Sequence, residues 1–334
     1  MYTLQIRAYK KFLGWKFYTE VGMQYGLATY QADDATRPAF VFEGRLVDLS
    51  DVVAFTDSDR DLSWMSSGGL NAIFRKWDEV GKELDILASR ATEELDGGNL
   101  STVSDDVRVM APIKPERIFC AASNYIEHAD EMGTVLAAKS ESNPYIFMKP
   151  PSCVIGNGDT VVKPAGCEML DWEVELAVVI GHRCRHVSVS DSLEVVAGYT
   201  IINDVSARDL NVRDDYPFKF DWFQGKCHDT FGPLGPWIVP SSSFGDPHNV
   251  RLQLDVNGET MQDGNTNKLI FNIAEQISYL SNILTLEPGD VIASGTPDGV
   301  GMGRGIFLKP GDIMVASIDG IGTLTNPVVG HGGS

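Results

Sequence analysis

Two glutamates, Glu173 and Glu175, stand one residue apart at the start of an apolar run that continues to Gly181. The β-branched residues of this run predict a buried strand, and side chains alternate faces on a strand, so both carboxylates should point the same way. Two like charges held side by side repel each other, and burying them is costly. A hard divalent cation such as Mg²⁺ or Mn²⁺ takes carboxylate oxygens and would remove the repulsion. The pair is therefore a candidate metal site, and a solvated strand end is the alternative.

A third carboxylate, Asp204, follows a second predicted strand that begins at Ala197 and ends near Asn203. Ligand-binding residues are common where a strand gives way to a loop. Asp204 could instead cap the helical turn that follows. Both roles can hold, because a carboxylate has two oxygens, and the third carboxylate strengthens the metal hypothesis.

Further motifs follow along the chain in an order typical of one family. They occupy residues 124–132, 147–150, 203–209, 225–233, 256–259, 288–292 and 294–301. Together with the spaced glutamates they resemble the fumarylacetoacetate hydrolase superfamily, in particular its FAH-domain-containing and acylpyruvase-like members, over roughly residues 113–327. The first hundred residues resemble the family only loosely.

The resemblance implies a metal site and the groups that work beside it. Glu173, Glu175 and Asp204 would hold one Mg²⁺ or Mn²⁺ per subunit, and Lys226 matches an active-site lysine that polarises a carbonyl or holds an enolate. A salt bridge from Lys226 to one of the carboxylates is the alternative. His128 and Glu131 share a face of a predicted helix, and spacing alone favours a surface pair. In similar hydrolases this motif is a water-activating dyad on a segment that orders over the site, which implies the same for His128 and Glu131.

Five further residues are expected to contact the substrate or its surroundings. Arg208 could orient the Asp204 carboxylate, and the Thr296 hydroxyl could meet a substrate carboxylate. Asn211 stands where some family hydrolases carry a glutamine that contacts substrate. Tyr125 and Lys149 lie within motifs of the family. The glycine-rich run 299–305 lacks the following helix of a dinucleotide-binding fingerprint and is predicted to be a flexible turn at the site mouth.

Composition limits the partners and the compartment. The chain has 334 residues, with 27 basic and 46 acidic side chains and a net charge of −19, which argues against nucleic acid and anionic membranes as partners. Its five cysteines are scattered without a Cys-x-x-Cys pair, which indicates reduced thiols. The first 11 residues lack the apolar core of a signal peptide. A cytoplasmic location is expected, and the family resemblance implies a homodimer.

The pattern of elements predicts an α+β fold that is mostly β. Short runs at 25–30, 39–42 and 45–49 predict strands, and 69–95 has helical spacing with a possible break at Gly81. Residues 1–108 are predicted to form a smaller N-terminal α+β domain, and 109–330 the catalytic domain, with helices at 126–139 and 267–282. The family resemblance implies a rolled core of mixed sheets that closes around the metal.

The function expected is hydrolysis of a C–C bond in a β-diketo or 2-oxo acid, such as an acylpyruvate or fumarylacetoacetate, by a metal-dependent enzyme of aromatic or sugar-acid catabolism. A 2-oxo acid decarboxylase, isomerase or dehydratase with the same metal–enolate site is the alternative, and a non-catalytic binding protein is a third. Specificity is assigned to segments 125–145 and 211–224. The aromatic stretch 216–223 indicates an apolar or ring-derived substrate, or else packing beneath the sheet.

Overall fold

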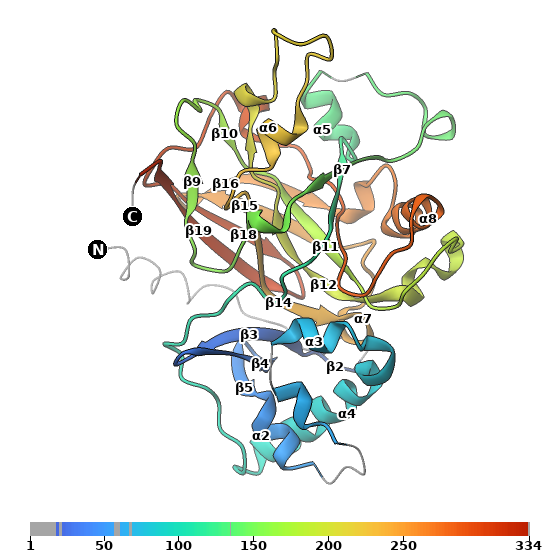
Figure 1. The fold of residues 1–334 in the computed structure, drawn as a ribbon, viewed down its shortest axis with the longest axis vertical. Helices are drawn as coiled ribbons and strands as arrows, with labels where there is room; N and C mark the ends of the chain where they lie inside the picture. Colours follow the sequence, from blue (N-terminus) through green and yellow to red (C-terminus); the bar gives the residue numbers. More distant parts are fainter. Residues whose placement is uncertain (1–17, 20–21, 57–60, 67–68, 134, 333–334) are drawn as a thin grey trace.

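A large sheet runs through the whole molecule. The computed structural model describes residues 18–19, 22–56, 61–66, 69–133 and 135–332. The strands of the large sheet are β3 (Gly26–Ala32), β4 (Ala35–Phe42), β5 (Arg45–Asp48), β6 (Ile118–Ala122), β7 (Tyr145–Lys149), β8 (Val154–Ile155), β11 (Val174–Ile180), β12 (Val196–Asn203), β14 (Gly232–Pro240) and β17 (Val291–Ala293). Their order is β5-β4-β3-β14-β12-β11-β17-β6-β7, with β8 beside β14 (Figure 1).

A second sheet packs against strands β11, β12 and β14 of the first. It contains β9 (Val161–Lys163), β15 (Arg251–Val256), β16 (Glu259–Asn265), β18 (Ile313–Ile318) and β19 (Gly322–Gly330). Two small antiparallel pairs join β1 (Tyr18–Thr19) to β2 (Gly22–Met23) and β10 (Leu170–Asp171) to β13 (Ser206–Ala207). Both sheets mix parallel and antiparallel pairs. The predicted strand-rich α+β fold is confirmed.

The helices lie around the sheets. They are α2 (Leu49–Ala54), α3 (Leu70–Phe74), α4 (Trp77–Asp96), α5 (Ile126–Glu131), α6 (Trp222–Lys226), α7 (Ser241–Phe244), α8 (Ile273–Ile283) and α9 (Gly301–Arg304). Helices α2 to α4 and strands β3 to β5 form the lower lobe of Figure 1. Leu27 of β3 pairs with Ile238 of β14, so the N-terminal strands extend the large sheet. The division into two domains near residue 108 stays a prediction.

Three predicted helices differ from those observed. The 69–95 segment breaks at Arg75 and Lys76, where the Phe74 and Trp77 rings stack 5.0 Å apart, and Gly81 stays helical beneath Trp77. The 126–139 helix ends at Glu131, because Gly133 adopts a left-handed conformation (φ +65°). The 267–282 helix begins only at Ile273, since a capping box formed by Asn272 and Glu275 fixes its start.

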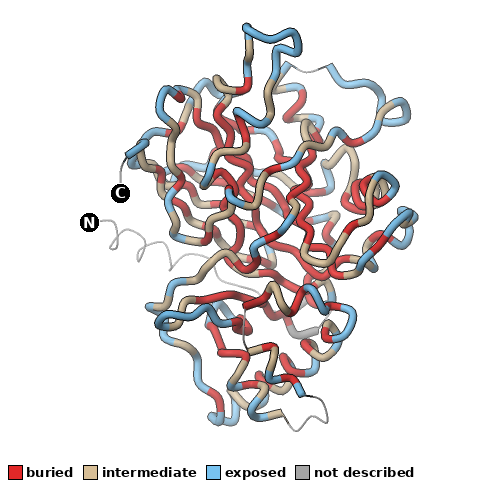
Figure 2. Tube along the Cα trace, in the orientation of Figure 1, coloured by how far each residue is buried: buried red, intermediate tan, exposed pale blue. Residues whose placement is uncertain are grey.

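The central strand pair sets the geometry of the site. All seven residues of β11 are buried, and its register with β12 pairs Val174 with Asn203. The amide of Asp204 therefore donates to the carbonyl of Glu173 at 2.8 Å. Figure 2 shows the buried residues concentrated along these central strands, while the loops at the top of the view are exposed. Within the residues described, no helix combines the length and apolar character needed to cross a membrane.

Replacing Gly198 of β12 by alanine should destabilise the fold. A Cβ there would lie 2.4 Å from the carbonyl oxygen of Val239 and 2.8 Å from Ile238, so the paired strands must separate. We expect the free energy of unfolding to fall by about 1–3 kcal/mol, measured by urea denaturation. Gly330→Ala is the matched control, because its Cβ would meet only Pro310 at 3.5 Å. An equal loss in both variants would contradict the close approach at Gly198.

Candidate metal and catalytic site

Three carboxylates meet where β11 begins and β12 ends. One oxygen from each of Glu173, Glu175 and Asp204 can be chosen so that all lie within 4.8 Å of one another. All three side chains are buried, with relative exposures of 5%, 1% and 1%. The alternation of side chains along the strand thus brings Glu173 and Glu175 to the same place, as predicted. Their burial excludes the alternative of a solvated strand end.

Two lysines lie against the carboxylates. Lys226, the last residue of α6, donates to Glu173 Oε2 at 2.8 Å and to Asp204 Oδ2 at 2.7 Å. Lys149, at the end of β7, donates to Asp204 Oδ1 at 2.5 Å and to the Val205 carbonyl at 3.2 Å. Each lysine is 1% exposed. The alternative interpretation of Lys226, a salt bridge to the carboxylates, is therefore observed.

Arg208 corrects one expectation about the site. Its guanidinium, in the 3₁₀ turn Arg208–Leu210, lies 2.8 Å from Asp171 Oδ2 and 2.5 Å from Glu173 Oε1. It orients Glu173, and not Asp204 as predicted, because the β10–β13 pair places it beside Asp171. Asp171 is a residue that the sequence reasoning missed. The alternation argument applied to Glu173 and Glu175 also covers Asp171, two residues earlier, and would have found it.

The two glutamates have opposite electrostatic surroundings. Burial opposes the ionisation of Glu173, but Lys226 and Arg208 hold its pKa well below the ordinary value. Burial, together with the charges of Asp204 and Glu173, raises the pKa of Glu175 well above the ordinary value. The hydrogen bond that supports the Glu175 carboxylate comes from the Gly295 amide, at 2.7 Å. Glu175 is thus the carboxylate whose charge is least compensated.

The buried charges do not balance within the protein. Four carboxylates face three cations, which leaves one negative charge uncompensated; the groups are Asp171, Glu173, Glu175 and Asp204 against Lys149, Lys226 and Arg208. A divalent cation would change the balance to one positive charge. Hard cations favour carboxylate oxygens. The donor set therefore fits Mg²⁺ or Mn²⁺.

His128 and Glu131 lie on the same side of α5 but do not hydrogen-bond. His128 is 6% exposed, and its Nδ1 lies 3.8 Å from Glu131 Oε2 and has no hydrogen-bond partner among the described residues. Glu131 instead accepts from the amide of Gly299, at 3.0 Å. Burial opposes ionisation of Glu131, yet the neighbouring His128 and the Gly299 amide lower its pKa. The two side chains therefore lie close together as an ion pair would, without a direct hydrogen bond between them.

Buried polar atoms without a protein partner gather among the predicted site residues. Besides His128, they include the Tyr125 hydroxyl and Asn211 Oδ1. Burial, with the charge of Glu175, raises the pKa of Tyr125. Asn211 lies against Gly225, where a Cβ would overlap its amide group. Native proteins pair nearly all such atoms, so these three atoms are candidates to bind a ligand or water.

The Thr296 hydroxyl has protein partners on both sides. It donates to the Val174 carbonyl at 2.9 Å and accepts from Gln262 Nε2 at 2.8 Å. To donate to a substrate carboxylate, as predicted, the Thr296 hydroxyl would have to give up its hydrogen bond to the Val174 carbonyl. Gln262 is a second residue that the sequence reasoning missed, and its amide also caps the Pro297 carbonyl at 2.9 Å.

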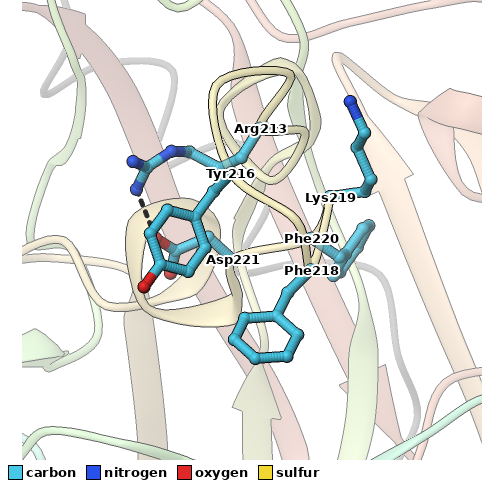
Figure 3. Close-up of a pocket in the computed structure, with 6 residues that line it drawn as sticks. All are labelled: Arg213, Tyr216, Phe218, Lys219, Phe220 and Asp221. Carbon is cyan, nitrogen blue, oxygen red and sulfur yellow. Dashed lines mark hydrogen bonds and ion pairs between the residues drawn. The ribbon is translucent and has the colours of Figure 1, made fainter.

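The aromatic stretch 216–223 is divided: Trp222 stacks on Phe147 of strand β7 at 4.6 Å, whereas two other rings point away from the core. Phe218 is 80% exposed and Phe223 is 75% exposed, which excludes packing beneath the sheet for these two rings. The loop that precedes α6 borders an open pocket of about 310 Å³, shown in Figure 3. It is lined by Arg213, Tyr216, Phe218, Lys219, Phe220 and Asp221. The chain continues from this loop into α6, whose last residue is Lys226 of the acid cluster.

Comparisons with known proteins cover most of the chain. The family described as fumarylacetoacetate (FAA) hydrolase C-terminal matches residues 117–329. The oxaloacetate tautomerase FAHD2A, mitochondrial, of Homo sapiens is 41% identical over 67% of this chain and 70% of its own length. The 2,4-didehydro-3-deoxy-L-rhamnonate hydrolase of Sphingomonas sp. (strain SKA58) is 43% identical over 73% and 84%.

A solved structure has a similar fold over most of both chains. The maleylpyruvate hydrolase of Sphingobium sp. SYK-6, in complex with manganese(II) and pyruvate, superposes with a TM-score of 0.68 at 28% identity, over 92% of this chain and 99% of that one.

Replacing Glu175 by glutamine should have opposite effects on metal binding and on metal-free stability. We expect the affinity for Mn²⁺, measured by isothermal titration calorimetry, to fall at least about 100-fold, because even residues that only support a ligand change affinity by about 10–100-fold. In EDTA the variant should unfold at a higher temperature than the parent, since burial and the neighbouring carboxylates oppose ionisation of Glu175 and glutamine cannot ionise. Glu116→Gln, at an exposed carboxylate, is the control. Unchanged Mn²⁺ affinity would exclude Glu175 as a ligand.

Proposed function

Because this chain belongs to the fumarylacetoacetate hydrolase family, we propose that it is a metal-dependent enzyme that hydrolyses a C–C bond in a β-diketo or 2-oxo acid. The observation that carries the proposal is the buried cluster of Glu173, Glu175 and Asp204, with Lys226 against it and His128 nearby on α5. The hydrolase from Sphingomonas and the manganese–pyruvate complex of a hydrolase support it.

One Mg²⁺ or Mn²⁺ per subunit would be held by Glu173, Glu175 and Asp204, where it supplies Lewis-acid stabilisation of an enolate. Lys226, fixed between Glu173 and Asp204, contributes a second positive charge beside the developing oxyanion. Arg208 holds one oxygen of Glu173 and thereby fixes that carboxylate. These groups favour substrates that become more negative in the transition state.

His128 is the proposed general base. It takes a proton from water as the water oxygen adds to the remote carbonyl carbon of the substrate. The C–C bond then breaks, its electron pair stays on the enolate of the 2-oxo acid, and a proton completes that product. Glu131, 3.8 Å from the imidazole, stabilises the positive charge on His128 while it holds the proton. The products are a carboxylic acid and pyruvate or a similar 2-oxo acid.

Tyr125 and Asn211 are the proposed substrate contacts, because their polar atoms are buried and have no protein partner. Lys149 and Thr296, whose polar groups are already paired, would maintain the shape of the site. Segments 125–145 and 211–224 carry exposed apolar side chains, Val135 and Phe218 among them, and we assign substrate selectivity to these segments. An apolar or ring-bearing acyl group would suit them.

Tautomerisation of a 2-oxo acid is the second candidate. The human relative is an oxaloacetate tautomerase by name, and a metal-stabilised enolate would serve that reaction as well. Tautomerisation needs only proton transfer, whereas hydrolysis needs water placed for attack. The buried Nδ1 of His128 has no partner among the described residues, which suits a role in proton transfer. Both reactions need such a role. Decarboxylation and dehydration would use the same enolate.

Location and assembly remain proposals. All five cysteines are unpaired, and four of them are buried, which suits the reducing cytoplasm, although the human relative is mitochondrial by name. A homodimer is proposed from the family resemblance. Light scattering on a size-exclusion column would measure the mass of the assembly directly.

Product analysis decides between the two candidate reactions. With acetylpyruvate and Mg²⁺ in H₂¹⁸O, we expect acetate that carries one ¹⁸O atom, together with pyruvate, and no turnover in EDTA. The measurement is mass spectrometry of the products, with oxaloacetate and fumarylpyruvate as parallel substrates. If acylpyruvates are untouched while the enol and keto forms of oxaloacetate interconvert faster, the protein is a tautomerase and the hydrolase proposal is wrong.

Replacing His128 by alanine should separate proton transfer from metal binding. We expect the kcat for hydrolysis to fall by about 10²–10⁴-fold, the usual contribution of a general base, while the Mn²⁺ affinity stays within about threefold of the parent. His186→Ala, at an exposed histidine, should change neither quantity. Undiminished hydrolysis by His128→Ala would exclude His128 as the base.

A further inference from the structure

The segment 299–303 is not the flexible turn that its glycines predict. Trp172 Nε1 donates to the Gly299 carbonyl at 3.1 Å, and Val300 is completely buried. The buried carboxylate of Asp171 accepts from the amides of Gly301 at 2.6 Å and Met302 at 2.9 Å. The segment is therefore attached to the protein core through both its carbonyl and its amide groups.

Helix α5 has few attachments of its own. Its start is fixed by Asn124, whose amide donates to the carbonyls of Phe271 at 2.9 Å and Ser294 at 2.8 Å. Within the helix only His128 and Ala129 are buried, so little apolar surface holds it down. Glu127 meets Lys268 at 3.2 Å, but this pair is exposed and contributes little. The far end of α5 depends on Glu131.

Glu131 connects the end of α5 to the fixed segment. Its two carboxylate oxygens accept from the Gly299 amide at 3.0 and 3.2 Å. Gly303 lies directly beneath this side chain. A Cβ on Gly303 would come within 2.2 Å of both Cγ and Cδ of Glu131 and 2.4 Å of Oε1. Since these are the outer atoms of a flexible side chain, the carboxylate would be displaced and the segment would stay in place.

We infer that residues 299–303 form a receptor for the Glu131 carboxylate that holds helix α5, and with it His128, over the acid cluster, and that Gly303 is a positioning residue because only a residue without a side chain leaves room for Glu131. The catalytic consequence rests on the proposed function of His128. The structural consequence does not, because the attachment of α5 can be measured without substrate.

Gly303→Ala tests the inference through hydrogen exchange. We expect amides of α5 to exchange at least about tenfold faster than in the parent, with no loss of thermal stability, because alanine suits the short helix α9 better than glycine. Glu131→Ala should accelerate hydrogen exchange of the α5 amides to the same extent. In the double variant Gly303→Ala/Glu131→Ala, no further acceleration is expected, since both changes remove one contact. Ile306→Ala, at a half-exposed side chain beyond the receptor, is the control.

Turnover and metal binding give the second measurement. If the product analysis has identified a substrate, kcat should fall at least about tenfold in Gly303→Ala, with KM and Mn²⁺ affinity within about threefold of the parent. Unchanged hydrogen exchange of the α5 amides in Gly303→Ala would overturn the inference. So would a double variant in which the accelerations caused by the two single changes multiply. A protein inactive on every substrate would refute the proposed function alone, because the exchange measurement would still decide the role of Gly303.

Discussion

The site depends on one electrostatic constraint: four carboxylates lie inside the protein, where water cannot screen them. A buried charge is tolerated only when it is paired or hydrogen-bonded. Lys226 and Lys149 form ion pairs with Asp204, and Arg208 forms ion pairs with Asp171 and Glu173. The lysine at the end of β7, the lysine at the end of α6 and the arginine after β13 converge for this reason. Among the described residues Glu175 is supported only by the Gly295 amide, so the cluster is suited to accept a divalent cation beside it.

The backbone brings these charges together from distant parts of the chain. The β11–β12 register puts Asp204 beside Glu173, and the β10–β13 register pairs Asp171 with Ser206, two residues before Arg208. Asp171 then extends the same network to the amides of segment 299–303. The Gly299 amide of that segment donates to Glu131, so the acid cluster and helix α5 contact the same supporting segment.

The sequence predicts what depends on local alternation, and it fails where a partner is chosen in three dimensions. The two-residue spacing of Glu173 and Glu175 was sufficient to place both carboxylates in one site. The partner of Arg208 could not be read from its closeness to Asp204 in sequence, because strand pairing sets its neighbours. The early end of α5 follows from the left-handed conformation of Gly133, which helical spacing does not reveal. Thr296 and Gln262 bond each other across 34 residues, and no local pattern indicates that contact.

The local charge of the site opposes that of the whole protein. The chain carries a net charge of −19, yet the cluster with a divalent cation has one positive charge. At physiological salt the surface field decays over about 8 Å, so the acidic surface repels an anionic substrate only weakly before it reaches the mouth of the site. Inside, low polarisability strengthens the attraction to the cation, Lys226 and Lys149. In the proposed function, an anionic substrate that enters would be held by the cluster itself, since salt screens the field of the acidic surface.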